Sequence, residues 1–125
     1  MYEVGLSRGF VAWHVMPGAD GPEGTLHSHD YRVDVVVSRP DVDDLGMVCD
    51  LDLLEAALEK VVGRVAGQNL EVIRPPGAEA VTVEVLARWV HEELSSHLEL
   101  DADLAVRAWE SPVAFGGYRA RVSSS

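Results

Sequence analysis

The spacing of apolar residues changes twice along this chain, and the order of these changes limits the folds that it can adopt. Residues 51–66 and 83–97 carry apolar side chains at the spacing of a helix that buries one face. Four other segments have the alternation or the composition of strands, namely residues 2–15, 25–38, 102–110 and 115–122. This order predicts an α+β fold, β-β-α-α-β-β, in which two helices cover one face of a four-stranded antiparallel sheet.

Turn and capping residues mark the ends of these segments. Residues 16–24 are rich in Gly and Pro and predict a loop that joins the first two strands as an antiparallel pair. Asp50 and Thr82 each precede a helical segment, where a side-chain oxygen can accept hydrogen bonds from free backbone N–H groups. Gly116 and Gly117 predict an interruption of the last strand.

The overall charge of the chain argues against some partners. Ten Lys and Arg residues against 21 Asp and Glu residues give a net charge of -11, which repels nucleic acids and anionic membranes. A phosphorylated ligand would need a local cluster of arginines to overcome this field. The nine arginines are scattered between Arg8 and Arg121, and their spacing alone does not bring them together.

Length and composition predict one soluble unit. The chain has 125 residues, 47% of them hydrophobic, which suits a single domain spanning residues 1–125. It contains one cysteine, Cys49, and no pattern of a secretory signal at its start. No apolar run approaches the roughly 20 residues that span a bilayer. We therefore expect a cytoplasmic protein without a membrane partner.

Three histidines are candidates for metal ligands. His27 and His29 are two residues apart in a predicted strand, so their side chains project from the same face. His14 lies at the loop end of the preceding strand, and the predicted hairpin brings it opposite this pair. Three histidines with one open position are typical of a catalytic zinc site. The alternative is that the His-x-His pair is solvated or packed in the core. We expect His91 and His97 to lie on the surface of the second helix and to have no role in the site.

Five segments of the chain resemble the motifs of a known family in the correct order. They read FVAWH at 10–14, LHSHDY at 26–31, GMVCDL at 46–51, VTVEVLARWV at 81–90 and WES at 109–111. Together they are similar to the 6-pyruvoyltetrahydropterin synthase and 6-carboxytetrahydropterin synthase family over the whole chain. The resemblance implies the T-fold of that family, with zinc as the cofactor and His14, His27 and His29 as its ligands.

The resemblance also implies a substrate residue and an assembly. Glu110 matches the family's pterin anchor, and a carboxylate can accept hydrogen bonds from the ring N–H and the amino group of a pterin at once. The alternative is a solvated carboxylate at the end of a strand. Family members form a barrel around a channel, with active sites between subunits, so we expect a pterin-like ligand and a homo-oligomer, a hexamer being favoured.

Two departures from the family pattern affect the expected reaction. The reactive cysteine before the His-x-His pair is absent, and Glu23 stands four residues before His27, similar to a family branch in which glutamate replaces cysteine and the pterin side chain is cleaved. Glu23 could be a catalytic base if burial raised its pKa; the alternative is an ordinary surface charge. The family's Asp-His pair is replaced by Ala66 and Gly67, which cannot relay a proton.

These observations leave two functions to compare. The first is a zinc-dependent lyase of this family that acts on a pterin or related heterocycle, but not through the standard synthase reaction. The alternative is a catalytically silent protein that binds zinc and a pterin or purine. A metal site of the cupin type also begins with His-x-His, but its downstream Glu and second His motif are missing.

Overall fold

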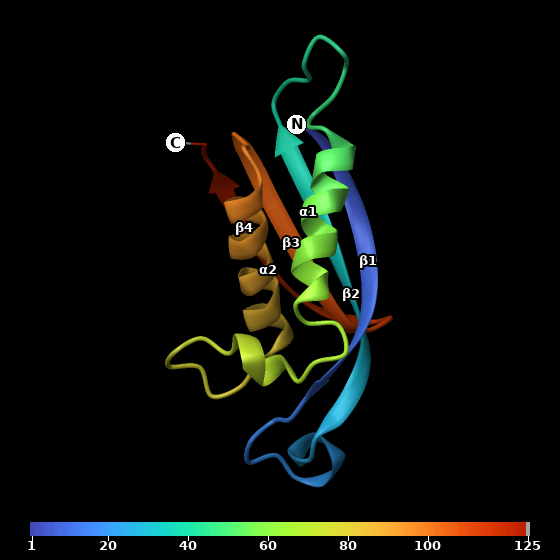
Figure 1. Cartoon of the computed structure of the whole chain (residues 1–125), viewed down its shortest axis with the longest axis vertical. Coiled ribbons are helices and arrows are strands. Elements are labelled where there is room, and N and C mark those ends of the chain that lie inside the picture. Colours follow the sequence, from blue (N-terminus) through green and yellow to red (C-terminus); the bar gives the residue numbers. More distant parts are fainter. Residues whose placement is uncertain (125) are drawn as a thin grey trace.

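Two helices cover one face of a four-stranded antiparallel sheet in the computed structural model, which describes residues 1–124 (Figure 1). The strands neighbour one another in chain order: β1 (Tyr2–His14), β2 (His27–Arg39), β3 (Ala102–Ser111) and β4 (Ala114–Val122). The helices are α1 (Leu51–Gly63) and α2 (Val83–His97), and short 3-10 turns span Gly21–Gly24 and Leu70–Ile73. The predicted α+β fold and its order of elements are confirmed.

The hydrophobic core lies between the sheet and the helices. Alternate residues of β2, including Val33, Val35 and Val37, are fully buried under the helices, and Leu54 of α1 and Leu86 of α2 meet them from above. Removing one such side chain from water contributes about 1.5–3 kcal/mol. The two-residue period of the strands and the 3.6-residue period of the helices therefore direct their apolar faces into one layer.

Both predicted helix caps are present. The Asp50 side chain accepts hydrogen bonds from the backbone N–H groups of Asp52 and Leu53, and Thr82 Oγ1 accepts one from Val85. The first helix ends at Gly63, earlier than the predicted residue 66. The backbone N–H groups of Arg64 and Val65 bond to carbonyl oxygens three residues back instead of four, and the chain then turns at Gly67, which has a φ of 73°. No helix within residues 1–124 is long and apolar enough to cross a membrane.

Two expectations from the sequence are wrong, for reasons of packing. Gly116 and Gly117 lie within an unbroken β4; a Cβ at Gly116 would come within 2.8 Å of the Glu84 backbone nitrogen, so this glycine lets the strand approach the start of α2. His91 is only 5% exposed and faces the sheet, where its Nε2 lies 3.2 Å from the carbonyl oxygen of Ala120.

One end of the β1–β2 hairpin extends beyond the rest of the sheet. These strands pair along their whole length, from Tyr2 with Arg39 to His14 with His27, whereas β3 pairs with β2 only as far as Arg32 with Trp109. Figure 1 shows this hairpin end and its loop projecting past both helices. The first five residues of β2 therefore have β1 as a neighbour on one side and open space on the other.

Candidate metal centre

The three candidate histidines come together at the projecting end of the hairpin. His14 pairs directly with His27, and Ala12 pairs with His29, so all three imidazoles lie on two adjacent strands. They share the strand face of the buried Ala12 and Tyr31, which is the face that the helices cover further along the sheet. The ring centroids of His14, His27 and His29 are between 4.4 and 5.0 Å apart.

Their spacing and that of a nearby carboxylate suit a metal ion. His27 Nε2 lies 3.1 Å from His29 Nε2 and 3.3 Å from Glu23 Oε2, and one donor atom from each of His14, Glu23, His27 and His29 lies within 4.8 Å of every other. In a tetrahedral zinc site, bonds of about 2.0–2.2 Å place neighbouring ligand atoms roughly 3.3–3.6 Å apart. The cluster therefore has the donor types and nearly the spacing that zinc requires.

The environment of His27 favours the tautomer that binds a metal. Its Nδ1 lies 2.7 Å from the carbonyl oxygen of Thr25, an acceptor only, so Nδ1 carries the proton and donates this hydrogen bond. The lone pair of Nε2 then faces His29 and Glu23. A hydrogen bond from the second ring nitrogen to a carbonyl oxygen is the usual way in which proteins orient a histidine ligand.

His14 gives the clearest sign of a missing partner. The side chain is buried, yet neither ring nitrogen has a hydrogen-bond partner within the described chain. Burial, and then the neighbouring His27 and His29, lowers the pKa of His14, which favours the neutral imidazole that metals bind. Because buried polar atoms are nearly always satisfied, a metal ion at this point would fit the residues present.

Glu23 reaches the cluster from the loop between β1 and β2. Its backbone oxygen accepts a hydrogen bond of 2.9 Å from the Met16 N–H, which closes the loop behind it. A Cβ at Gly24 would overlap the carbonyl oxygen of Ala19, so the next position must be glycine in this conformation. The Glu23 side chain is 58% exposed, and this chain alone therefore does not bury it.

Glu110 and one histidine of the cluster, His29, line the same open cavity. The cavity has a volume of about 550 Å³ and occupies the space between the projecting end of β2 and the end of β3, with His29, Tyr31 and Glu110 in its wall. The Glu110 carboxylate has no hydrogen-bond or ion-pair partner in residues 1–124. It is thus available to a ligand that also reaches the metal cluster.

Tyr31 is a residue of this cavity that the sequence interpretation did not single out. Its ring packs against Phe10, His14 and His29, and its side chain is buried. Burial, followed by the negative charges of Glu110 and Glu23, raises the pKa of Tyr31, so its hydroxyl stays protonated. The signal was available, because Tyr31 follows His29 by two residues and must share its face.

The wall beside Glu110 is held by a cross-strand network. Trp109 Nε1 donates a hydrogen bond of 2.7 Å to Asp34 Oδ2, and the Arg32 guanidinium lies 4.7 Å from the centre of the Trp109 ring. Ser7 donates a further bond of 2.6 Å to Asp34 Oδ1. Three strands are therefore connected next to the cavity, and this fixes the end of β3 where Glu110 lies.

The residues in place of the family's Asp-His pair lie beside β1. The N–H of Gly67 donates to the carbonyl oxygen of Val11, at 2.6 Å, and the N–H of Trp13 donates to that of Gln68, at 2.9 Å. The loop thus runs along the edge of β1 next to His14. Ala66 and Gly67 bring no group there that can transfer a proton.

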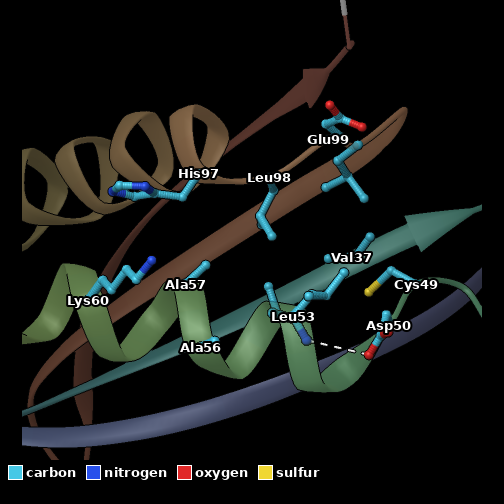
Figure 2. Close-up of a pocket in the computed structure, with 12 residues that line it drawn as sticks. Val37, Cys49, Asp50, Leu53, Ala56, Ala57, Lys60, His97, Leu98 and Glu99 are labelled. Carbon is cyan, nitrogen blue, oxygen red and sulfur yellow. Dashed lines mark hydrogen bonds between the residues drawn. The ribbon is translucent and has the colours of Figure 1, made fainter.

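Another groove lies away from this cluster, between α1 and the segment that follows α2. Figure 2 shows Leu53 and Leu98 across this groove, with Lys60 and His97 toward one end and Cys49 toward the other. It shares no residue with the metal cluster or with the cavity that Glu110 lines. Burial, and then the charge of Asp50, raises the pKa of Cys49, so this thiol is not activated as a nucleophile.

Several solved structures with the same fold are described as 6-pyruvoyl tetrahydropterin synthases. The Caenorhabditis elegans 6-pyruvoyl tetrahydropterin synthase superposes with a TM-score of 0.73 at 26% identity, covering 96% of this chain and 97% of that one. The Plasmodium falciparum enzyme gives a TM-score of 0.78 at 17% identity, with 97% and 98% covered. A Plasmodium vivax enzyme described as a catalytic residue mutant, with glutamate changed to alanine, gives 0.75 at 15%, with 97% and 98% covered.

Sequence comparison defines the family of this chain. Among curated proteins, none matches the sequence. The model of the family described as 6-pyruvoyl tetrahydropterin synthase matches residues 3–121, which include the histidine cluster, Glu23 and Glu110. With this match over nearly the whole length and the same fold in solved members, the chain belongs to the 6-pyruvoyl tetrahydropterin synthase family.

Proposed function

We propose that this protein binds zinc through His14, His27 and His29 and acts as a lyase on a pterin or a related heterocycle held by Glu110. The observation that carries the proposal is the position of Glu110, whose unpaired carboxylate shares a cavity with His29 of the metal cluster. One molecule in this cavity can therefore contact both. Family membership supports the choice of a pterin.

Glu110 provides recognition. A pterin presents a ring N–H and an exocyclic amino group on one edge, and a single carboxylate can accept both hydrogen bonds. The cavity of about 550 Å³ lies within the usual range for a small-molecule site, about 300–1,000 Å³. Tyr31 beside it contributes a protonated hydroxyl that can donate to an oxygen or nitrogen of the ligand.

Zinc, when bound, would supply a Lewis acid that polarises a hydroxyl or carbonyl oxygen of the substrate side chain. The chain's own residues prepare the site for it. Thr25 holds the Nδ1 proton of His27 away from the cluster, and the buried, neutral His14 offers a free lone pair. The donor set of nitrogens and a carboxylate suits zinc better than Ca²⁺ or Mg²⁺, which prefer oxygen ligands alone.

Glu23 is the residue that we assign to proton transfer. It would accept the proton of a side-chain hydroxyl as the adjacent carbon–carbon bond breaks; the leaving part departs as an aldehyde, and the carbon that stays on the ring takes up a proton. The catalytic glutamate named for the Plasmodium vivax enzyme supports a carboxylate in this task. Ala66 and Gly67 cannot relay protons, and this argues against the standard synthase reaction.

Assembly of several copies would complete the site, and we propose a hexamer. β1 and β4 are the edge strands of the sheet, and apart from the end of β1 that bonds to the loop at Gly67 their edges are open, which favours pairing with another chain. A neighbouring copy could then cover Glu23, which is largely exposed in the single chain. Light scattering should give a mass near six times the 13.6 kDa of one chain; a monomer in solution would contradict this part of the proposal.

A second candidate is a binding protein that has kept the metal and the heterocycle site but lost catalysis. The missing thiol and the Ala66-Gly67 replacement favour it. Saturable binding of a pterin or purine that depends on Glu110, without any turnover, is the result that it predicts. Absence of binding to both classes would exclude it.

The deciding experiment incubates the zinc-loaded protein with 7,8-dihydroneopterin and, separately, with its triphosphate, and separates the products by chromatography. We expect a shortened pterin side chain and release of an aldehyde. Glu23→Gln should stop turnover while pterin binding persists, and Glu55→Gln, an exposed glutamate on α1, should leave turnover unchanged. Binding without product in the unmodified protein favours the second candidate.

A further inference from the structure

Exposed apolar side chains gather around the first turn of α1, at the end of the molecule opposite the loop of the β1–β2 hairpin (Figure 1). Leu53 is 63% exposed and Leu51 40%, and Met47 in the preceding loop is 36% exposed. Tyr2, at the start of β1, adds a ring that is 56% exposed. Contiguous apolar side chains on the outside of a protein commonly mark a surface that contacts another molecule.

Two grooves run along either side of this turn. The larger has a volume of about 450 Å³ and lies between α1 and the segment that follows α2, with Leu53 and Leu98 across it from each other (Figure 2). The smaller, of about 250 Å³, lies between the start of β1 and the loop before α1, with Tyr2 and Leu51 in its wall. Cys49 lines both grooves, so they adjoin and form one surface, which we call the apolar surface.

The charge around the apolar surface is negative. Residues 40–59, which form the loop and most of α1, contain seven carboxylates and no Lys or Arg. Of these seven, only Glu59 forms an ion pair within residues 1–124, and its partner is Arg8. Two cations lie near the surface, but they do not balance the other six carboxylates: Arg39 donates to a backbone carbonyl oxygen, and Lys60 lies at the far end of the larger groove (Figure 2).

We propose that the apolar surface binds a basic amphipathic helix of another protein. Apolar residues three and four apart on such a helix project from one face in steps of about 5–6 Å, so they can enter two adjoining grooves. Lys and Arg side chains beside them would face the carboxylates of residues 40–59, and this complementary charge selects the partner. A second copy of this chain is a poor occupant, because the contact would bring two acidic surfaces together.

The apolar surface is separate from the metal centre. Tyr2 pairs with Arg39 at one end of the β1–β2 hairpin, and His14 pairs with His27 at the other. Neither groove shares a residue with the metal cluster or with the cavity that Glu110 lines. A helix bound at the apolar surface would therefore leave that cavity open, and the inference does not rest on the proposed reaction.

Fluorescence anisotropy with a labelled synthetic helix of leucine and lysine, with all leucines on one face, tests the proposal. We expect saturable binding, and a peptide of the same composition with the leucines scattered around the helix should bind about tenfold more weakly or worse. The double variant Leu51→Ser/Leu53→Ser should lose affinity for the amphipathic peptide by about the same factor. Val72→Ser/Val113→Ser, which replaces two exposed valines elsewhere, should bind it as the unmodified protein does.

A charge arm separates this surface from general attraction to an acidic protein. Asp44→Asn/Asp52→Asn should weaken binding and reduce its dependence on salt, whereas the exposed pair Asp20→Asn/Asp30→Asn, near the hairpin loop, should do neither. Circular dichroism checks that each variant is folded.

Three results would overturn the proposal. The first is equal binding of the amphipathic and scattered peptides. The second is that either control pair weakens binding as much as the pair that it matches. The third is a fall in oligomer mass of the leucine variant in light scattering, which would assign the apolar surface to a contact between copies of this chain.

Discussion

His14 lies directly opposite His27 in the β1–β2 hairpin, and their ring centroids are 4.4 Å apart. This cross-strand pair determines the geometry of the metal centre, because His29 follows His27 on the same strand face. A shift of one residue in the pairing would turn His14 to the other face of the sheet. The loop of residues 16–24, which sets this register, therefore also assembles the site.

Removing one histidine should abolish metal binding. We expect the purified protein to contain about one zinc per chain. His27→Ala should lose most of it, because the variant lacks one of the three nitrogen ligands and keeps only two nitrogens and a carboxylate. His97→Ala is the matched control, since His97 is exposed at the end of α2 and has no part in the cluster. Elemental analysis gives the measurement, and full zinc content in His27→Ala would show that the metal lies elsewhere.

Glu110→Gln should weaken pterin binding by about tenfold or more. The amide keeps the size of the side chain but offers one acceptor oxygen and a donor that meets the donors of the pterin edge. Zinc content should not change, because Glu110 is not in the metal cluster. Calorimetry with a dihydropterin checks this, with the exposed Glu99→Gln as control; unchanged affinity in Glu110→Gln would remove the anchor from the proposal.

Much of the fold follows from local patterns in the sequence. Alternation in β1 and β2 and the helical period of α1 and α2 depend on neighbouring residues only, and the caps at Asp50 and Thr82 act within one turn. The convergence of His14, His27 and His29 was predictable for the same reason. Strand parity and one hairpin bring all three together, and no distant contact is needed.

Features that depend on distant contacts were not predictable in this way. Gly116 permits the approach of α2, which lies about thirty residues earlier in the chain, so as a local signal it resembled a strand breaker. Asp34 and Trp109 meet only when β3 pairs with β2. The wrong expectation of an exposed His91 could have been avoided, because His91 lies four residues after the buried Ala87 and three before the buried Leu94, on the same face of the helix.

Gly116→Ala should destabilise the fold. The added methyl group would meet the Glu84 backbone nitrogen and a Val83 methyl carbon at 2.8 Å each, so β4 or α2 must move, at a cost of about 1–3 kcal/mol. Gly63→Ala is the contrasting control. Nothing lies within 4 Å of its added methyl group, and alanine favours helix by up to about 1 kcal/mol. Urea unfolding compares them, and equal stability of Gly116→Ala and the unmodified protein would contradict the close approach.

Asp34→Asn should destabilise the protein in a manner that depends on pH. Burial opposes ionisation of Asp34, but hydrogen bonds from Ser7, Trp109 and Arg32 outweigh it and hold the pKa of Asp34 below its usual value of 3.8. A carboxylate with a lowered folded-state pKa adds stability above pH 3.8, and this is lost as the pH falls through the folded-state value. We expect a loss of about 1–2 kcal/mol at pH 7 that narrows below pH 3.8. Asp30→Asn, which replaces an exposed carboxylate on the same strand, should change the free energy of unfolding little at pH 7 or below pH 3.8. Urea unfolding gives the measurement. If Asp34→Asn lowers stability equally at both pH values, the charge of Asp34 is not what the network stabilises.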